Sequence, residues 1–257
     1  MNKADLVADL RRRMGEYDRV IFAKSVGMQP DPWQADLLRS DSDRVLLNCS
    51  RQSGKSTVAA VIALHRALYQ DGALVLILAP SERQAKELFS KIAEFYGQLP
   101  ESQPVSSDSY RKMGMSLTNG SRIEALPGTE KTVRGFSGVD LLILDEAARV
   151  DDELYHAVRP MLAVSGGGLM MLSTPYGKRG AFYEEWTFGG DVWDRYRVTA
   201  EECPRISSTF LERERHAVPL RVYRQEYFCS FEDTMAQIFS EEVIRELSDM
   251  TIEETEI

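Results

Sequence analysis

The sequence predicts an α/β protein in which helices flank a mostly parallel central sheet. Continuous apolar runs, such as residues 73–79 and 141–144, lack the alternation of apolar and polar residues that half-exposed strands show. Such runs are typical of strands buried on both faces, and stretches with helical spacing separate them. Polar sequences follow three of the strands, at the sheet edge where open α/β sheets bind ligands.

Composition excludes some classes of protein. The 257 residues are 43% hydrophobic and 28% charged, as in an ordinary globular chain. No apolar run approaches the roughly 18 residues of a membrane-spanning helix, and the N-terminus has no apolar signal segment, so neither a membrane nor a secreted location is expected. The three cysteines lie far apart, which argues against a zinc site or disulfide framework and suits a reducing cytoplasm.

The net charge of the chain is concentrated in one segment. Residues 232–257 hold nine acidic residues and one arginine, a net charge of −8 out of a total of −9. The rest of the chain is therefore nearly neutral and can present a basic face to nucleic acid, so the acidic balance neither excludes nor supports a DNA partner.

Two helices are predicted before the first strand. Residues 2–25 show apolar residues at helical spacing with arginines between them, and a turn at 30–33 leads into a helix at 34–39. Gln34 has an amide that both donates and accepts hydrogen bonds, so one hypothesis is that it recognises the edge of an adenine base.

A polar loop follows the predicted strand at 45–47 and ends in Gly54-Lys55-Ser56-Thr57, the order of a phosphate-binding P-loop. Lys55 would reach the β/γ-phosphates and Ser56 would ligate Mg²⁺, while loop amides and the following helix dipole face the phosphates. Cys49 replaces the first glycine of the usual pattern, so the loop alone could also be a simple strand-to-helix turn. The residues expected to contact the nucleotide are Gln34, Ser50, Gln52, Ser53, Gly54, Lys55, Ser56 and Thr57.

The remaining elements are predicted by the same criteria of periodicity, turn residues and caps. They are a strand at 73–79, a helix at 82–96 capped by Ser81, a loop at 97–111, a hairpin of strands 116–117 and 122–126 about Asn119-Gly120, strands at 169–172 and 195–198, and helices at 208–216 and 219–228.

Two acids end the apolar strand at 141–144, which is typical of a Walker B motif. Asp145 would hold the Mg²⁺ shell and Glu146 would polarise the attacking water. Adjacent acids at a buried strand end are costly unless a metal or water needs them, although a pair of helix-start acids is the alternative. Ser173 and Thr174 follow another apolar strand and would sense the γ-phosphate, or else cap a helix or turn.

Four segments together carry a resemblance to a known family. They are residues 50–56, with an arginine in the phosphate loop and no leading glycine; 144–147, Leu-Asp-Glu-Ala; 173–175, Ser-Thr-Pro; and 223–228, Tyr-Arg-Gln-Glu-Tyr-Phe. From Trp33 to about Asp233 the chain resembles the ATPase domain of the large terminase subunit, the DNA-packaging motor of tailed bacteriophages. The family tolerates the missing glycine at Cys49.

The resemblance implies a RecA-like additional-strand P-loop ATPase fold with a small lid. The N-terminal helical segment would be 1–30, the ATPase core 31–199, the lid 200–235 and an acidic linker or tail 236–257. Family members usually carry a C-terminal nuclease domain. Because this sequence stops at Ile257, we expect an isolated motor domain, cut short or naturally so, without nuclease activity.

The resemblance also implies a function and partners. ATP hydrolysis with Mg²⁺ would drive double-stranded DNA into a procapsid, in the host cell cytoplasm and without a membrane. The partners would be the portal protein, the small terminase subunit and further copies of the chain in a homomeric ring, a pentamer. The isolated domain would be monomeric and slow. Ser173 and Thr174 would form the coupling motif.

Basic residues have two expected roles. Phosphoryl transfer usually needs a further cation at the γ-phosphate, which Arg51 would supply within its own subunit or Arg134 would supply to a neighbour. The resemblance favours Arg134 as the trans-acting finger and Arg51 as a nucleotide sensor. The candidates for contact with DNA phosphates, which are otherwise ordinary surface residues, are Arg83, Lys86, Arg111 and Lys112.

Other functions compete with this interpretation. A helicase-type or other nucleic-acid-dependent RecA-like ATPase is the nearest, but a full helicase needs a second RecA domain that the sequence does not show. A non-hydrolysing assembly subunit gated by nucleotide would have no use for Glu146. A small-molecule kinase would bring a lid rich in paired arginines.

Overall fold

The computed structural model describes residues 14–99, 113–129, 133 and 135–233. Its centre is a seven-stranded sheet in the order β3-β4-β2-β5-β6-β1-β7, in which every neighbouring pair is parallel except β3 and β4. The strands are β1 Arg44–Cys49, β2 Leu74–Ala79, β3 Gly114–Ser116, β4 Arg122–Pro127, β5 Leu141–Asp145, β6 Gly168–Ser173 and β7 Asp194–Val198. The predicted mostly parallel sheet is confirmed.

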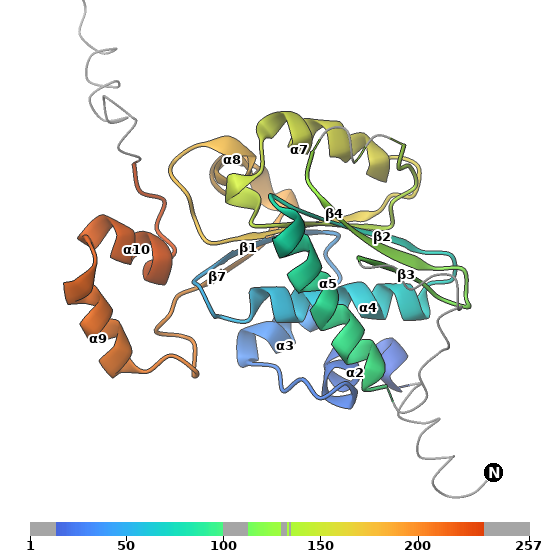
Figure 1. Cartoon of the computed structure of the whole chain (residues 1–257), viewed down its shortest axis with the longest axis horizontal. Helices are drawn as coiled ribbons and strands as arrows, with labels where there is room; N and C mark the ends of the chain where they lie inside the picture. Colours follow the sequence, from blue (N-terminus) through green and yellow to red (C-terminus); the bar gives the residue numbers. More distant parts are fainter. Residues whose placement is uncertain (1–13, 100–112, 130–132, 134, 234–257) are drawn as a thin grey trace, which may run out of the picture.

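Helices cover both faces of the sheet (Figure 1). Helices α2 to α5 pack on one face and α7 and α8 on the other, while α9 and α10 form a pair beside the β7 edge. The helices are α2 Arg19–Ser25, α3 Pro32–Arg39, α4 Lys55–Tyr69, α5 Glu82–Gly97, α7 Asp152–Val158, α8 Gly180–Phe188, α9 Ser208–Ala217 and α10 Leu220–Phe228, with short 3-10 helices η1 Ala147–Arg149, η2 Arg159–Leu162 and η3 Gly190–Val192.

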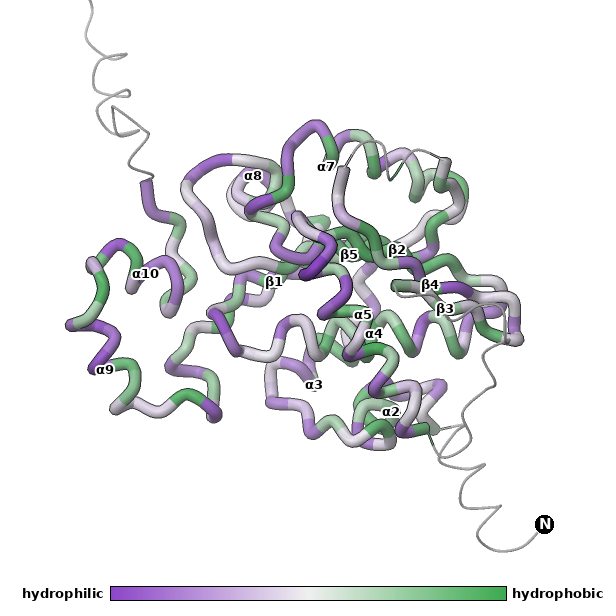
Figure 2. Tube along the Cα trace, viewed as in Figure 1, coloured by the Kyte–Doolittle hydropathy of each residue, from purple (hydrophilic) through white to green (hydrophobic). Residues whose placement is uncertain are grey.

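The continuous apolar strands are explained by two separate cores. In β2, Val75 and Ile77 pack beneath α4 and α5, whereas Leu76 and Leu78 pack beneath α7 and α8. Successive side chains of a strand point to opposite faces, so a strand covered on both sides must be apolar at every position. Figure 2 shows apolar segments gathered in these central strands. No helix in the described ranges is both long and apolar enough to cross a membrane.

Most of the predicted elements lie within a few residues of the observed ones. The Ser81 hydroxyl accepts from the Gln84 amide and so caps α5 as predicted, and β3 and β4 form the antiparallel hairpin predicted about Asn119-Gly120. Most of the loop predicted at 97–111, and the acidic segment 236–257, lie outside the described residues.

The prediction of one helix over 2–25 is wrong in its described part. The helix that contains Met14 stops at Tyr17, and α2 begins at Arg19. Asp18 lies between them in an extended conformation, with φ −129°, and its Oδ1 accepts from the Val20 amide at 2.7 Å. An aspartate that caps a new helix offers its backbone an alternative to continuing the previous one, and apolar spacing does not register this competition.

His65 in α4 is a half-buried titratable group close to aromatic side chains. Its ring centroid lies 5.3 Å from that of Phe22 and 4.7 Å from that of Tyr69, and its Nε2 lies 3.0 Å from the carbonyl oxygen of Gly15. Desolvation is the main cause that lowers the pKa of His65 from 6.5 to about 4, with two nearby arginines acting in the same direction.

We expect the stability of the protein to fall as the pH drops from about 6.5 toward 4, because unfolded His65 takes up a proton that folded His65 does not. His65→Gln removes the titrating group and still offers a donor to the Gly15 carbonyl. Its free energy of unfolding should therefore fall less over this range, by up to about 1.4 kcal/mol per pH unit. Urea unfolding of both proteins at pH 7, 6 and 5 measures the difference; parallel losses would contradict the expectation.

Candidate functional site

Three strands bring the predicted site residues together at one edge of the sheet. Because β5, β6 and β1 are adjacent and parallel, the segments that follow them meet at their carboxyl ends. The Nζ of Lys55, on the first turn of α4, donates to Thr174 Oγ1 at 3.2 Å and lies 3.8 Å from Glu146 Oε1. Thr174 Oγ1 in turn donates to the Cys49 carbonyl at 3.1 Å, and Ser173 Oγ to the Thr174 carbonyl at 2.8 Å.

The loop between β1 and α4 has the turned backbone of an anion-binding site. The Ser50 amide donates to the Val198 carbonyl at 2.9 Å, and Ser53 Oγ donates back to the Ser50 carbonyl at 2.9 Å. Gln52 and Gly54 take left-handed conformations, with φ 59° and 94°. Such alternation turns successive N–H groups toward one concavity, at the N-terminus of α4.

Cys49 occupies the place of the missing first glycine without strain. It is the last residue of β1, fully buried and paired with Val198 of β7, and its φ is not positive. Since the chain is still extended at this point, no glycine is required there. The left-handed positions that the loop does need come later, at Gln52 and Gly54.

Asp145 is a buried carboxylate with little compensation from the protein. It is 6% exposed, and its Oδ1 accepts from the Glu146 amide at 3.0 Å. Burial is the main cause that raises its pKa to about 7, the negative charge of Glu146 adds to the effect, and Lys55 opposes it. A carboxylate held this way gains from a nearby cation, so its chemistry fits a metal ligand.

Glu146 takes an unusual backbone conformation. Its φ of 52° and ψ of 42° are left-handed, which is uncommon for a residue other than glycine. This conformation ends β5 abruptly and leads into η1, leaving the Glu146 side chain beside Lys55. Strain of this kind persists where the surrounding structure imposes it, and it is frequent at active sites.

The residues at this edge fit a magnesium nucleotide. Groups of three or more His, Cys, Asp and Glu side chains that would form a cage for a metal are not found among the described residues. Mg²⁺ at a phosphate site needs only one or two protein oxygens, because phosphates and water supply the others. The Asp145 carboxylate and the Ser56 hydroxyl, on the first turn of α4, are of the type required.

Gln34 is placed differently from the role predicted for it. The side chain is 2% exposed; its Oε1 accepts from the Asp31 amide at 2.9 Å and its Nε2 donates to the Gly54 carbonyl at 3.2 Å. Both ends of the amide therefore bind backbone, and recognition of an adenine edge would require one of these bonds to break. In this structure Gln34 joins α3 to the phosphate loop.

The C-terminal helical pair, α9 and α10 with the segment before them, also contacts the phosphate loop. Arg51 forms an ion pair with Glu226, although its side chain is 66% exposed, and its amide donates to the Glu226 carbonyl at 3.4 Å. Arg205 donates to the Ser53 carbonyl at 2.7 Å and pairs with Asp31. The sequence analysis missed Arg205 and the role of Glu226, because neither stands in a recognisable motif and both contacts join residues more than 150 positions apart.

The other predicted site residues are not brought into this cluster. Arg83 and Lys86 are exposed near the start of α5, which follows β2 at the same edge of the sheet, and their contact with DNA stays a prediction. Arg111, Lys112 and Arg134 lie outside the described residues.

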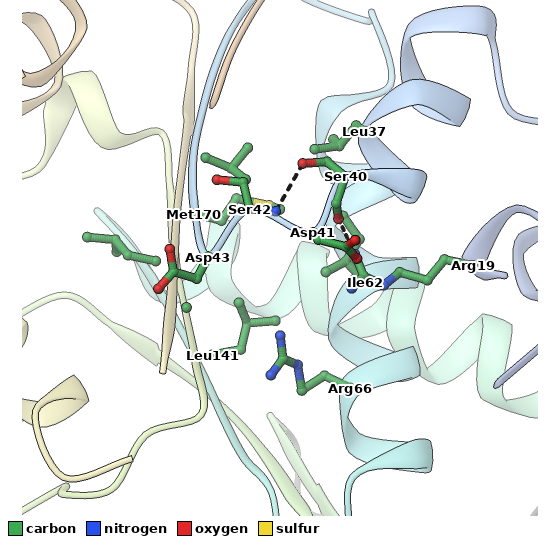
Figure 3. Close-up of a pocket in the computed structure, with 13 residues that line it drawn as sticks. Arg19, Leu37, Ser40, Asp41, Ser42, Asp43, Ile62, Arg66, Leu141 and Met170 are labelled. Carbon is green, nitrogen blue, oxygen red and sulfur yellow. Dashed lines mark hydrogen bonds between the residues drawn. The ribbon is translucent and has the colours of Figure 1, made fainter. Parts of the chain in front are cut away.

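A small cavity lies at the opposite edge of the sheet (Figure 3). It is bordered by the beginnings of β5 and β6, at Leu141 and Gly168, and by the polar segment 40–43 that precedes β1. Its volume of about 60 Å³ is enough for a few waters and far below that of a typical ligand pocket. We therefore place the functional site at the edge that holds Lys55 and Asp145.

Comparison with known proteins agrees with this geometry. The sequence matches the family described as "Terminase large subunit, T4likevirus-type, N-terminal" over residues 46–246. It is 26% identical over 254 residues to the terminase large subunit of Thermus phage G20c, a match that covers 85% of this chain and 52% of the relative. The terminase large subunit of Thermus virus P23-45 matches equally well. The chain spans about half the length of these curated relatives.

Solved structures show the same fold. The large terminase ATPase domain of Thermus phage P74-26 superposes with a TM-score of 0.72 at 24% identity, covering 82% of this chain and 97% of that domain. The large terminase of bacteriophage HK97 superposes with a TM-score of 0.64 at 18% identity, covering 79% and 51%. The large terminase of a thermophilic bacteriophage, in complex with ADP, superposes with a TM-score of 0.61 at 13% identity, covering 82% and 52%.

These superpositions confirm the predicted RecA-like additional-strand fold, in which β6 lies between the P-loop strand β1 and the acidic strand β5. The family match includes the phosphate loop, the Asp145-Glu146 pair and the Ser173-Thr174 pair. It extends over most of the chain. The chain therefore belongs to the family of the N-terminal domain of the T4-like terminase large subunit.

Proposed function

We propose that the chain is the motor domain of a viral DNA-packaging machine, hydrolysing ATP with Mg²⁺ to move double-stranded DNA into a procapsid. One observation supports the hydrolytic part most directly. A buried lysine at the start of α4 lies within 3.8 Å of a strained glutamate at the end of β5, beside a buried aspartate that lacks a full counter-charge. Family membership supports the packaging part.

In this proposal each residue of the edge has one role. The loop amides and Lys55 bind the β/γ-phosphates, and Ser56 and Asp145 hold Mg²⁺, which neutralises phosphate charge when bound. Glu146 orients the attacking water and accepts its proton, since its Oε1 lies beside the lysine that marks the γ-phosphate. Thr174, bonded to Lys55, would report the state of the γ-phosphate to β6 as the coupling motif.

The two arginines take different roles. Arg134 would complete the site of a neighbouring subunit as a trans-acting finger. Arg51 is held against Glu226 of α10, so its proposed role as a nucleotide sensor would act through the lid, residues 200–235. An arginine at the γ-phosphate typically contributes about 10³–10⁵ in rate, so its absence leaves a slow enzyme.

The proposed assembly is a homomeric ring, a pentamer, around DNA in the host cell cytoplasm, with the portal protein and the small terminase subunit as partners. Arg83, Lys86, Arg111 and Lys112 are the proposed contacts to DNA phosphates. Such contacts depend on charge rather than base sequence, so DNA binding should weaken steeply as salt rises.

The proposal is tested by the steady-state rate of ATP hydrolysis as a function of protein concentration, with and without duplex DNA. A rate that rises more steeply than linearly, and rises further with DNA, is expected for a site completed between subunits. No hydrolysis at any concentration, with DNA and Mg²⁺ present, would contradict the proposed function.

A further inference from the structure

Arg205 connects two parts of the nucleotide edge that are distant in sequence. Its Nη2 donates to the Ser53 carbonyl at 2.7 Å, and its guanidinium faces both oxygens of Asp31, with Nη1–Oδ1 at 2.9 Å and Nη2–Oδ2 at 2.7 Å. Asp31 precedes α3, whereas Arg205 belongs to the segment between β7 and α9. The contact therefore joins the ATPase core, the phosphate loop and the lid segment.

The phosphate loop needs donors on its outer side. In a trans peptide the carbonyl of one residue and the N–H of the next point in opposite directions. If the Ser53 carbonyl is held outward by Arg205, the Gly54 N–H must point into the concavity, where an anion would bind. Arg205 thus fixes the direction of a loop amide without touching the ligand itself.

Neighbouring carbonyls of the loop are held outward in the same way. The Gly54 carbonyl accepts from Gln34 Nε2 at 3.2 Å, and the Gln52 carbonyl lies 3.8 Å from the Cys203 thiol. A Cβ added to Gly54 would lie 2.6 Å from Gln34 Nε2 and 3.2 Å from Arg205 Nη2. The outer side of the loop is therefore closely packed, and two of its donors come from the lid segment.

We propose that Arg205 is a positioning residue for nucleotide binding, which holds the Ser53–Gly54 peptide of the phosphate loop in its anion-binding orientation and couples that orientation to the position of the lid. The inference rests on the proposed function. Arg205 suits the role because its planar guanidinium binds Asp31 with two parallel contacts and still donates to a carbonyl. With Arg205 removed, the peptide loses its charged donor and is free to rotate.

The test measures the affinity of the whole chain for a fluorescent ATP analogue with Mg²⁺, together with kcat and KM for ATP. We expect Arg205→Ala to weaken binding about tenfold or more, the value of one hydrogen bond to a charged group, and to raise KM more than it lowers kcat. Arg205→Lys keeps the charge but not the fork and should lose about threefold. Arg213→Ala, an exposed arginine of α9, is the matched control and should bind as the wild type does.

Asp31→Asn separates positioning from simple anchoring of the lid. It removes the ion pair but leaves Arg205 able to donate to Ser53, so its loss of affinity should be smaller than that of Arg205→Ala. Equal losses in these two variants, or affinity within twofold of the wild type for Arg205→Ala, would overturn the inference. If the alanine variant does not fold, wild-type affinity in Arg205→Lys would overturn it instead.

Lys55→Ala distinguishes failure of this inference from failure of the proposed function. If Lys55→Ala loses nucleotide binding while Arg205→Ala keeps it, only the role of Arg205 is overturned. If Lys55→Ala binds the analogue as the wild type does, the nucleotide site itself is misplaced and both proposals are wrong.

Discussion

Replacing Glu146 by glutamine is expected to lower ATP turnover by about 10²–10⁴-fold while nucleotide affinity stays within a few fold. The amide of glutamine has nearly the shape of the carboxylate and can remain beside Lys55, where Glu146 Oε1 now lies 3.8 Å from the lysine Nζ. It cannot accept a proton from water, so only the chemical step is slowed. Steady-state hydrolysis and binding of a fluorescent ATP analogue measure the two effects separately.

Glu153→Gln is the matched control for this prediction. Glu153 is an exposed acid on α7, a few residues further along the chain, and its amide variant should hydrolyse ATP at the wild-type rate. Wild-type turnover in Glu146→Gln would show that Glu146 is not the base, and would favour a chain that uses nucleotide only as a structural switch.

Replacing Arg134 by alanine is expected to lower turnover by about 10³–10⁵-fold at protein concentrations where subunits associate. The expectation follows from the proposed trans-acting role, in which the guanidinium stabilises charge on the γ-phosphate of a neighbouring subunit. Nucleotide affinity should change little, since Lys55 and the loop amides of the same subunit remain. The measurement is ATPase rate and analogue binding for the purified variant.

Mixing subunits makes this prediction specific. Lys55→Ala lacks its own nucleotide site but retains Arg134, so adding it to Arg134→Ala should restore part of the turnover. An arginine acting within its own subunit would give no such rescue, and Arg51 would then be the candidate. Normal hydrolysis by Arg134→Ala alone would contradict the assignment.

Local patterns were enough to predict the sheet and the position of its functional edge. A strand buried on both faces must be apolar throughout, and a phosphate loop must combine left-handed positions with a lysine at a helix start, so β2, β5 and the 50–57 loop are legible in the sequence. The order of strands then brings Lys55, Glu146 and Thr174 together, because parallel strands end at one edge.

The sequence by itself determined which segments form strands, which loop can bind phosphate and which acids follow it. Tertiary structure alone decided that the Gln34 amide is used by backbone, that Asp18 divides the N-terminal helix, and that Arg205 holds the loop from the lid side. The physical reason is range: periodicity and motifs express interactions between near neighbours, whereas the Arg205–Ser53 bond joins residues 152 positions apart and exists only after the chain has packed.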